Sequence, residues 1–264
     1  MQPELHLGPI TVQTFGLMVA LGAIAGGTLV LRRFRELGLP EQWGNEGCFV
    51  AVLGGLAGAR LNAIVVDYDA VKDDLLGNLL TGTALVWYGG LIGGAIAVLL
   101  WARWRGILNL TLLDIAAPAL AIGQAIGRIG CQLSGDGDYG IPWDGPWAMA
   151  YPDGALPTNV PVHPTPIYET LALGLTAYVL WRLRAALRPG LLFALYLVLM
   201  GTERFLVEFV RRNDEVLAGL TQAQLFSLAA IALGGAWLGV QARRRGLRAD
   251  APSLRVSSSA SPSP

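Results

Sequence analysis

Long apolar stretches constrain the fold of this chain more than any other feature of its sequence. A helix needs about 20 predominantly apolar residues to cross the hydrocarbon core of a bilayer. Stretches of about this length occur at residues 9–31, 47–66, 83–102, 110–131, 165–181, 190–209 and 222–242. We therefore expect an all-α, polytopic membrane protein with about seven transmembrane helices, which form a single transmembrane domain over residues 1–248.

The composition favours a membrane protein over a soluble domain. Hydrophobic residues make up 53% of the 264 residues and charged residues only 14%, against about a quarter in ordinary soluble domains. The formal net charge is zero, so no basic surplus indicates a nucleic-acid partner. Two cysteines and two histidines are too few for a disulfide framework or a typical zinc or iron centre. We expect no metal and no bound cofactor.

The distribution of basic residues predicts the orientation. The segments between the expected helices alternate between two sets, of which one contains thirteen Lys and Arg residues and the other three. Because cytoplasmic loops are enriched in basic residues, we expect an outside N-terminus and a cytoplasmic C-terminus in a bacterial inner membrane. Residues 132–164, rich in Gly and Pro, then form a periplasmic segment. The Pro- and Ser-rich residues 249–264 form a disordered cytoplasmic tail.

Three arginines interrupt the expected membrane helices: Arg60, Arg128 and Arg204. A guanidinium group stays protonated at biological pH and is costly to place in hydrocarbon. At 1.5 Å per residue, each lies roughly 20–27 Å from the cytoplasmic start of its helix, in the outer half of the bilayer. Phosphates of outer-leaflet lipids lie at that depth, and a planar guanidinium can bind phosphate through two parallel hydrogen bonds.

Carboxylates close by leave a structural alternative open. The arginines could pair with acidic side chains of the chain itself and hold the helices together. The candidate partners are Glu203, Glu208, Asp136 and Asp138. Glu208 follows Arg204 by four residues and shares its helical face, whereas Asp136 follows Arg128 by eight residues.

Glycines four residues apart recur in two of the expected helices. The pairs are Gly89/Gly93, Gly90/Gly94 and Gly123/Gly127. Small residues at this spacing let two membrane helices approach closely. We interpret these glycines as helix-packing positions, and Gly89 and Gly90 also belong to a motif with a second interpretation.

Four motifs resemble those of the prolipoprotein diacylglyceryl transferase family, over about residues 8–243. They are YGGLIGG at 88–94, GRIGCQLSGDGDYG at 127–140, HPTPIYE at 163–169, and RFLVEFVRRND at 204–214 followed by GLTQAQLFS. The first three are similar to the family patterns HGGLIG, GRxGNFxNxExxG and HPSQLYE, and the fourth to the family's arginine motif in the sixth helix. All four occur in the family's order and at the ends of helices expected to face outward.

The resemblance implies a reaction and its partners. Members of the family transfer the diacylglyceryl group of phosphatidylglycerol to the lipobox cysteine thiol of a prolipoprotein, and they release glycerol 1-phosphate. The partners are therefore phosphatidylglycerol and prolipoprotein signal peptides. Arg128 matches the signature arginine and would bind the lipid phosphate. Arg204 matches the second arginine, so that both arginines are catalytic candidates, and Glu208 is the helical partner of Arg204. The further substrate-binding candidates are Arg60, Gly89, Gly90, Asp136 and Gly140.

The chain departs from the family where proton transfer is expected. The family's histidine, first-helix tyrosine and two signature asparagines are replaced by Tyr88, Phe15, Cys131 and Ser134, and the segment DGDYG contains one extra residue. Tyrosine has a reference pKa near 10 and is a poor base near neutral pH. His163, whose intrinsic pKa is close to neutrality, is the other candidate for the catalytic base, besides Tyr88.

Two alternative functions stay open. A diverged paralogue would keep the lipid donor and modify another acceptor, and the replacements at Tyr88, Phe15 and Cys131 favour this interpretation. A non-catalytic lipid-binding or transport protein would instead use the arginines to line a passage. Only an enzyme would release glycerol phosphate from the lipid.

Overall fold

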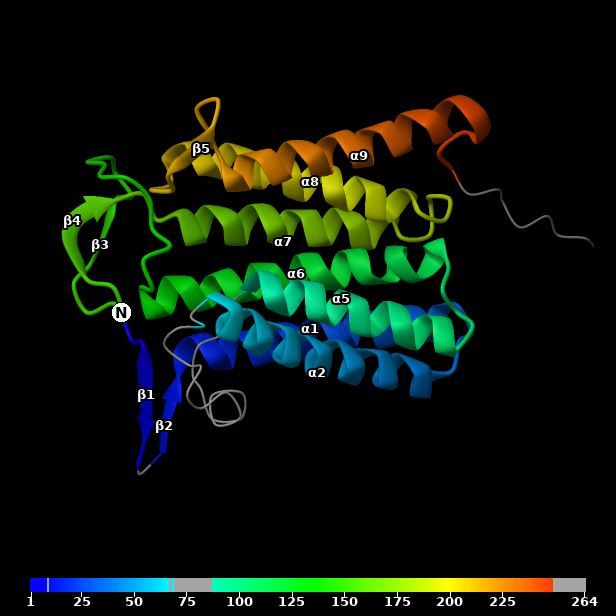
Figure 1. The fold of residues 1–264 in the computed structure, drawn as a ribbon, viewed down its shortest axis with the longest axis horizontal. Coiled ribbons are helices and arrows are strands. Elements are labelled where there is room, and N and C mark those ends of the chain that lie inside the picture. Colours follow the sequence, from blue (N-terminus) through cyan, green and yellow to red (C-terminus); the bar gives the residue numbers. More distant parts are fainter. Residues whose placement is uncertain (9, 67, 69–86, 249–264) are drawn as a thin grey trace, which may run out of the picture.

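The computed structural model describes residues 1–8, 10–66, 68 and 87–248 (Figure 1). The description leaves out the side chains of Leu7, Ile10, Trp87, Tyr88 and Arg245. The tail expected over residues 249–264 lies outside the described residues.

Seven α-helices make up most of the described chain, and each overlaps one of the apolar stretches. They are α1 (Thr14–Glu36), α2 (Glu41–Val66), α5 (Trp87–Trp104), α6 (Leu110–Ser134), α7 (Thr165–Leu183), α8 (Leu191–Val207) and α9 (Gln222–Arg245). A 3₁₀ turn, η2 (Glu208–Val210), continues from α8. The prediction of a mostly helical protein is confirmed. Four helices, α1, α2, α6 and α9, are long and apolar enough to cross a membrane, and α5 is a shorter apolar helix.

Helix α6 lies in the middle of a slab of helices (Figure 1) and packs against α1, α7 and α8. Its small residues Ala117 and Ala121 are fully buried against Ala177 and Leu180 of α7 and against Tyr196 of α8. Small side chains let these helix backbones approach closely. Helices α2 and α5 form one outer pair, and α8 and α9 form another.

The outer pair of α2 and α5 packs through glycines. A Cβ atom on Gly58 would overlap the carbonyl oxygen of Gly89 and lie 2.7 Å from the Cα atom of Gly93. On α6, the carbonyl oxygen of Gly123 lies 2.9 Å from the position of a Cβ atom on Gly22 of α1. The packing interpretation is therefore confirmed for Gly89, Gly93 and Gly123. It is wrong for Gly127, where an added Cβ atom would meet no atom within 4 Å among the described residues.

Large apolar side chains cover the outside of the slab. Examples with exposed fractions between 66% and 75% are Val65, Leu100, Leu171 and Leu233. Water disfavours such extensive apolar surfaces, which mark contact with lipid or with other proteins. The exposed faces of the helices therefore agree with a membrane protein.

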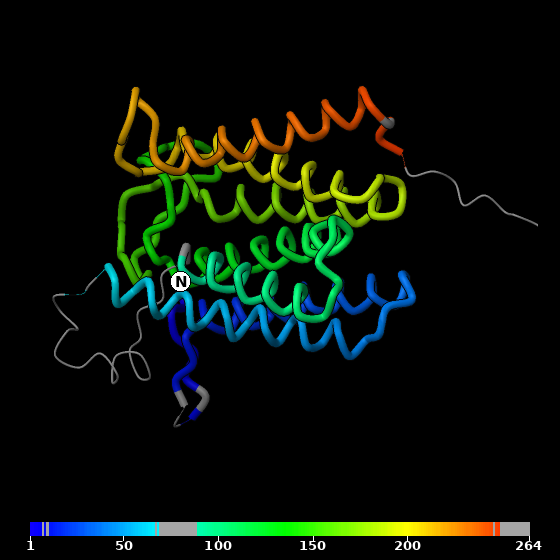
Figure 2. The backbone as a smooth tube through the Cα atoms, turned by 45° about the vertical axis from the view of Figure 1, so that its right-hand side comes forward, coloured from blue at the N-terminus to red at the C-terminus, as the bar shows by residue number. Residues whose placement is uncertain are grey.

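Three antiparallel hairpins lie at one end of the slab (Figures 1 and 2). They are β1 (Glu4–Leu7) with β2 (Ile10–Gln13), β3 (Met149–Tyr151) with β4 (Thr158–Val162), and β5 (Glu215–Leu217) with β6 (Leu220–Thr221). The sequence interpretation contained no strands, so these short hairpins correct the all-α description. We call this end of the slab the hairpin end.

The opposite end holds the turns between α1 and α2, between α5 and α6, and between α7 and α8, together with the end of α9 (Figure 1). All described basic residues of the thirteen-residue set lie on these turns or the adjoining helix ends. Glu36 pairs with three of them, with its carboxylate oxygens 2.9 Å from Nη1 of Arg33, 2.8 Å from Nη2 of Arg184 and 3.7 Å from Nε of Arg32. We call this the basic end. The charge asymmetry between alternate loops is thus an asymmetry between the two ends of the molecule.

Candidate active site: an arginine cluster at the hairpin end

Three arginines from two segments meet at the hairpin end. Arg128 lies near the end of α6, Arg204 lies in the last turn of α8, and Arg211 follows η2. Glu169, near the start of α7, lies between them. Because α6 and α8 end where α7 begins, the three helices bring these side chains together.

Glu169 is the central anion of the cluster, and its side chain is only 1% exposed. Its Oε1 atom lies 3.0 Å from Nη1 of Arg204. Its Oε2 atom lies 3.1 Å from Nε of Arg128 and 3.3 Å from Nη1 of Arg211. One buried carboxylate thus contacts three guanidinium groups.

Glu208 is the second buried anion, and it confirms the expected pairing with Arg204. Its Oε2 atom lies 2.8 Å from Nη2 of Arg204 and 3.9 Å from Nε of Arg211. Its Oε1 atom accepts hydrogen bonds from Nδ2 of Asn213 at 2.6 Å and from the Thr221 hydroxyl at 2.7 Å. Arg204 is therefore held between two buried carboxylates.

Asp138 is the third anion and differs from the other two in its position. It lies on the loop after α6, and its side chain is 31% exposed. One carboxylate oxygen accepts from Nη1 of Arg128 and the other from Nη2 of Arg211. Burial opposes ionisation of Asp138, but the attraction of the two guanidinium groups is stronger and lowers its pKa. Asp138 is therefore an ionised carboxylate that bridges two arginines.

The loop that carries Asp138 is fixed on both sides. Gly135 ends α6 with a left-handed φ of 59°, which glycine adopts without a steric penalty. The Gly140 N–H donates to the His163 carbonyl at 2.8 Å, and a Cβ atom on Gly140 would overlap the carbonyl oxygen of Val210. Gly140 is therefore a position where only glycine fits this backbone approach, which explains its place in the motif.

Comparison with known proteins agrees with this arrangement of motifs. The family model for prolipoprotein diacylglyceryl transferase matches residues 3–240. The chain belongs to the prolipoprotein diacylglyceryl transferase family. It is 34% identical over 240 residues to the phosphatidylglycerol–prolipoprotein diacylglyceryl transferase of Clostridium tetani, with 89% of this chain and 95% of the relative covered. It is 31% identical over 264 residues to the protein of the same name from Gloeobacter violaceus, with 94% of each covered.

His163 lies in an aromatic group, apart from the hydrogen bonds of the transferase's arginine cluster. Its ring stacks on Trp143 with 4.3 Å between centroids and 10° between planes. Its Nδ1 atom lies 3.2 Å from the Tyr168 hydroxyl oxygen, which accepts a hydrogen bond from Nε1 of Trp147 at 2.7 Å. Burial lowers the pKa of His163, so its imidazole is neutral at pH 7 and can accept a proton.

Asp136 is close to the cluster, but the arginine-bound aspartate is Asp138. The Asp136 Oδ1 atom accepts a hydrogen bond from the Asp138 N–H at 3.3 Å. Burial and the nearby Asp138 carboxylate raise the pKa of Asp136. Ligand atoms of Cys131, Asp136 and Asp138 lie within 4.8 Å of one another, but both carboxylate oxygens of Asp138 already bind arginines.

The other residues expected to bind the substrate lie on α2 and α5. Arg60 belongs to α2, at the edge of the slab opposite α8 and α9 (Figure 1). Gly89 and Gly90 lie in the first turn of α5, where Gly89 contacts α2. The Tyr88 side chain lies outside the described residues. The structure therefore gathers Arg128 and Arg204, and it places Arg60 on another part of the slab.

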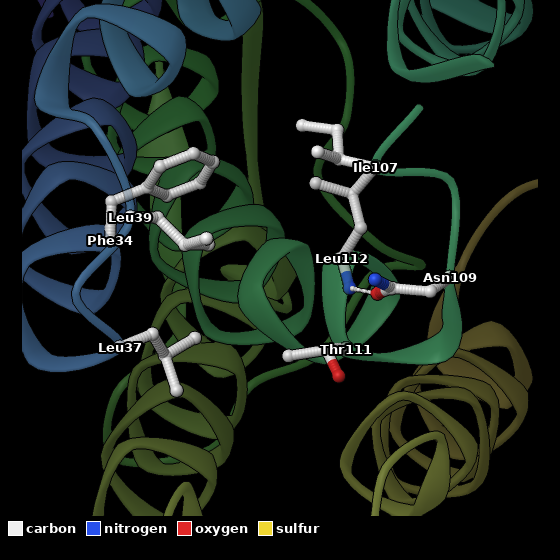
Figure 3. A pocket seen from close by; sticks show the side chains of 7 residues that line it. All are labelled: Phe34, Leu37, Leu39, Ile107, Asn109, Thr111 and Leu112. Carbon is white, nitrogen blue, oxygen red and sulfur yellow. Dashed lines mark hydrogen bonds between the residues drawn. The ribbon is translucent and has the colours of Figure 1, made fainter. Parts of the chain in front are cut away.

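A hollow at the basic end is unrelated to this cluster. Its lining comes from the end of α1, the start of α6 and the turns beside them: Phe34, Leu37, Leu39, Ile107, Asn109, Thr111 and Leu112 (Figure 3). Most of these side chains are apolar, and Asn109 uses its side-chain oxygen to accept a hydrogen bond from the Leu112 N–H at 3.1 Å. Asn109 therefore caps α6, and the hollow supplies no cation for a phosphate.

The sequence does not single out two members of the cluster as site residues. Arg211 lies between two expected helices, although it follows Glu208 by three positions in a continuous motif. Glu169 directly follows Tyr168 in its motif, and no local pattern marks it as a partner of the arginines. Helical spacing could have indicated Arg211, but only the packing of α7 between α6 and α8 reveals the three contacts of Glu169.

We expect Glu169→Gln to destabilise the protein strongly, because three guanidinium groups would lose their shared anion. Removing one partner of a buried charge pair costs about 3–5 kcal/mol. Glu215→Gln is the matched control, since Glu215 is exposed at the same end of the molecule. Thermal unfolding in detergent measures both variants. Equal melting temperatures for the two variants would contradict the central role of Glu169.

Proposed function

We propose that this chain transfers the diacylglyceryl group of phosphatidylglycerol to the lipobox cysteine thiol of prolipoproteins and releases glycerol 1-phosphate. The names of its relatives state this activity. The observation that carries the proposal is the arginine cluster. In this member of the family, Arg128 lies at the hairpin end, between the buried carboxylate of Glu169 and the partly exposed carboxylate of Asp138. The enzyme acts on lipid and signal-peptide substrates within a bacterial membrane.

We further propose that all seven helices cross the inner membrane as a single domain over residues 1–248. Even the shortest, α8, has 17 residues and is about 26 Å long, close to the roughly 30 Å thickness of the hydrocarbon core. The basic end faces the cytoplasm by the positive-inside rule. The hairpin end, the N-terminus and the segment 132–164 then face the periplasm, where lipoprotein precursors emerge.

This orientation predicts the signals of two reporter fusions. A reporter fused after Arg248 should report the cytoplasm, because that residue belongs to the basic end. A reporter inserted near Gly154, in the turn between β3 and β4, should report the periplasm. The reverse pair of signals would place the arginine cluster in the wrong leaflet and would overturn the site.

Arg128 is the residue to which we assign the donor phosphate. The acceptor sulfur forms a bond to the terminal glycerol carbon, and the C–O electron pair leaves with the phosphate oxygen. The thiol proton passes to a base. Negative charge grows on the phosphate as the bond breaks, and a preplaced guanidinium in a low-dielectric site stabilises that charge. Arg204, occupied by Glu169 and Glu208, positions this arrangement through Glu169.

The remaining assignments follow from the loop and from the family motifs. Asp136 and Gly140 shape the loop beside Arg128, and Glu208 holds Arg204 in place. Contacts of Arg60, Gly89 and Gly90 with substrate stay a prediction from sequence.

We expect Arg128→Gln to lower glycerol phosphate release from labelled phosphatidylglycerol by about 10²–10³, the usual effect of removing one donor to a developing oxyanion. Arg128→Lys should be less impaired, because it keeps the charge and loses the bidentate geometry. The double variant Arg128→Gln/Asp138→Asn removes one charge of each sign. It should recover melting temperature relative to Arg128→Gln without recovering activity. A stable and active Arg128→Gln variant would remove Arg128 from the mechanism.

For the base, we propose His163, with Tyr88 as the competing candidate. We expect His163→Gln to lower turnover by about 10²–10⁴, while Tyr88→Phe retains most of it. Because burial lowers the pKa of His163, its neutral form persists to below the ordinary pKa of about 6.5. Activity should therefore fall only as the pH drops below about 6.5, and this acidic limb should disappear in His163→Gln. An inactive Tyr88→Phe with an active His163→Gln would assign the role to the phenol.

A second function with the same donor is supported by the replaced motif residues. A paralogue that modifies another acceptor would still use Arg128, and Tyr88 and Cys131 stand where the family has a histidine and an asparagine. Glycerol phosphate release that is independent of a lipobox peptide would identify such an enzyme. Absence of release with any acceptor would instead support a non-catalytic lipid-binding or transport protein.

A further inference from the structure

We propose that the Asp138 carboxylate is a resident substitute for the donor phosphate, which the lipid displaces from a site formed by Arg128 and Arg211. The inference rests on the proposed function. It adds Arg211 to the donor site, and it makes Asp138 a residue that sets the affinity for the lipid. The ligand class is a phosphodiester monoanion.

The first argument is the geometry of the bridge. The two oxygens of Asp138 each accept from a different guanidinium, Arg128 on one side and Arg211 on the other. A phosphodiester likewise has two non-bridging oxygens that share one negative charge, and guanidinium groups bind both kinds of anion through paired hydrogen bonds. The lipid phosphate can therefore replace the carboxylate between the same two donors.

The second argument is the charge balance of the ion-paired groups. Three cations, Arg128, Arg204 and Arg211, face three anions. The anions are Asp138, Glu169 and Glu208. A phosphodiester that entered without displacing a carboxylate would add an unbalanced negative charge, and an empty site would leave an unbalanced positive one. Both states are unfavourable at low dielectric, so a one-for-one exchange is the favoured route.

The third argument is that Asp138 is the one anion of the three that can leave easily. Its side chain is 31% exposed, against 1% for Glu169 and 0% for Glu208. Glu169 and Glu208 are held by several donors from different elements. Of the two arginines that Asp138 bridges, Arg128 is 24% exposed and Arg211 is 8% exposed, so Arg128 is the more accessible half of the site.

The loop allows this exchange without a change of fold. Its two ends are held, by the Leu156 N–H to the Gly135 carbonyl at 2.9 Å and by the Gly140 N–H to the His163 carbonyl at 2.8 Å. The Asp138 backbone is also fixed, because its carbonyl accepts from the Thr165 hydroxyl at 2.5 Å. Rotation of the Asp138 side chain alone can therefore vacate the site while the backbone stays in place.

Asp138→Asn tests the exchange, because it removes the competing charge and keeps the shape. If Asp138 occupies the site about nine-tenths of the time, its removal strengthens apparent lipid binding about tenfold. We expect the KM for phosphatidylglycerol to fall about tenfold, with kcat within about twofold of the native enzyme. Asp153→Asn is the control, because it removes the same charge at an exposed position between β3 and β4. An unchanged or raised KM in Asp138→Asn would overturn the proposal.

A series of melting temperatures in detergent distinguishes competition between Asp138 and the lipid from a purely structural role of Asp138. Without lipid, Asp138→Asn should melt below the native enzyme, because two arginines lose a partner. Phosphatidylglycerol should then raise its melting temperature more than that of the native enzyme, since ligand stabilisation grows with affinity. Asp138→Glu keeps the charge and should show the native response. Equal lipid-induced shifts in Asp138→Asn and the native enzyme would overturn the proposal.

The choice of ligand identifies what the site recognises. Inorganic phosphate and glycerol 1-phosphate should stabilise Asp138→Asn more than the native enzyme if the phosphate group alone suffices. If only phosphatidylglycerol does so, the site requires the lipid headgroup in its membrane setting, which also supports the exchange. Diacylglycerol, which lacks phosphate, should shift both proteins equally, and a larger shift of Asp138→Asn by diacylglycerol would contradict the assignment.

Arg211 is tested by a double-mutant cycle. Arg211→Gln should raise the KM for phosphatidylglycerol about tenfold, and Asp138→Asn should bring little improvement in that background, because both changes act on one site. Additive effects would overturn the shared site. Failure of the native enzyme to release glycerol phosphate would refute the proposed function, whereas release with an unaltered KM in Asp138→Asn would refute only the exchange.

Discussion

The contact of one buried carboxylate, Glu169, with three guanidinium groups is the interaction on which the functional end of this molecule depends. Charged side chains at the edge of a membrane need counter-charges or polar ligands. Glu169 supplies that counter-charge from α7, while Arg128 comes from α6 and Arg204 from α8. The shared carboxylate thus connects the ends of three helices whose other contacts are mainly apolar.

The cluster gives Arg128 internal partners, and the proposed exchange adds ligand binding to that internal pairing. The sequence left both open for Arg128. In the structure Arg128 pairs with Asp138 and Glu169, as the internal alternative expects. Because Asp138 is accessible and Glu169 is not, the proposed exchange keeps the pair with Glu169 and replaces the pair with Asp138 by a ligand. A charged residue can in this way remain neutralised in every state of the reaction cycle.

Local patterns in the sequence predicted the features that depend on local geometry. Apolar length located all seven helices, and four-residue spacing identified the pairing of Glu208 with Arg204 as well as the glycine contacts of α2 and α5. The partner of Arg128 could not be found in this way, because Gly135 turns the chain in a left-handed conformation and ends the helical periodicity before Asp138. The role of Glu169 depends on packing between segments about 40 residues apart. The hairpins contain strands of two to five residues, too short for an alternating pattern to be recognised.

The unequal match to the family motifs agrees with the different demands of the two catalytic roles. Stabilisation of the charge on a departing phosphate is commonly the largest single contribution to catalysis, and the proposed mechanism assigns this role to Arg128. A general base contributes about 10²–10⁴, and it acts on a thiol with a reference pKa of about 8.5, which a neighbouring arginine lowers further. Replacement of the family histidine by Tyr88 is therefore compatible with the proposed mechanism, in which His163 receives the proton. His163 and Tyr88 are both candidates to receive a thiol proton, whereas the proposed phosphate site depends on the specific geometry of Arg128 and Arg211.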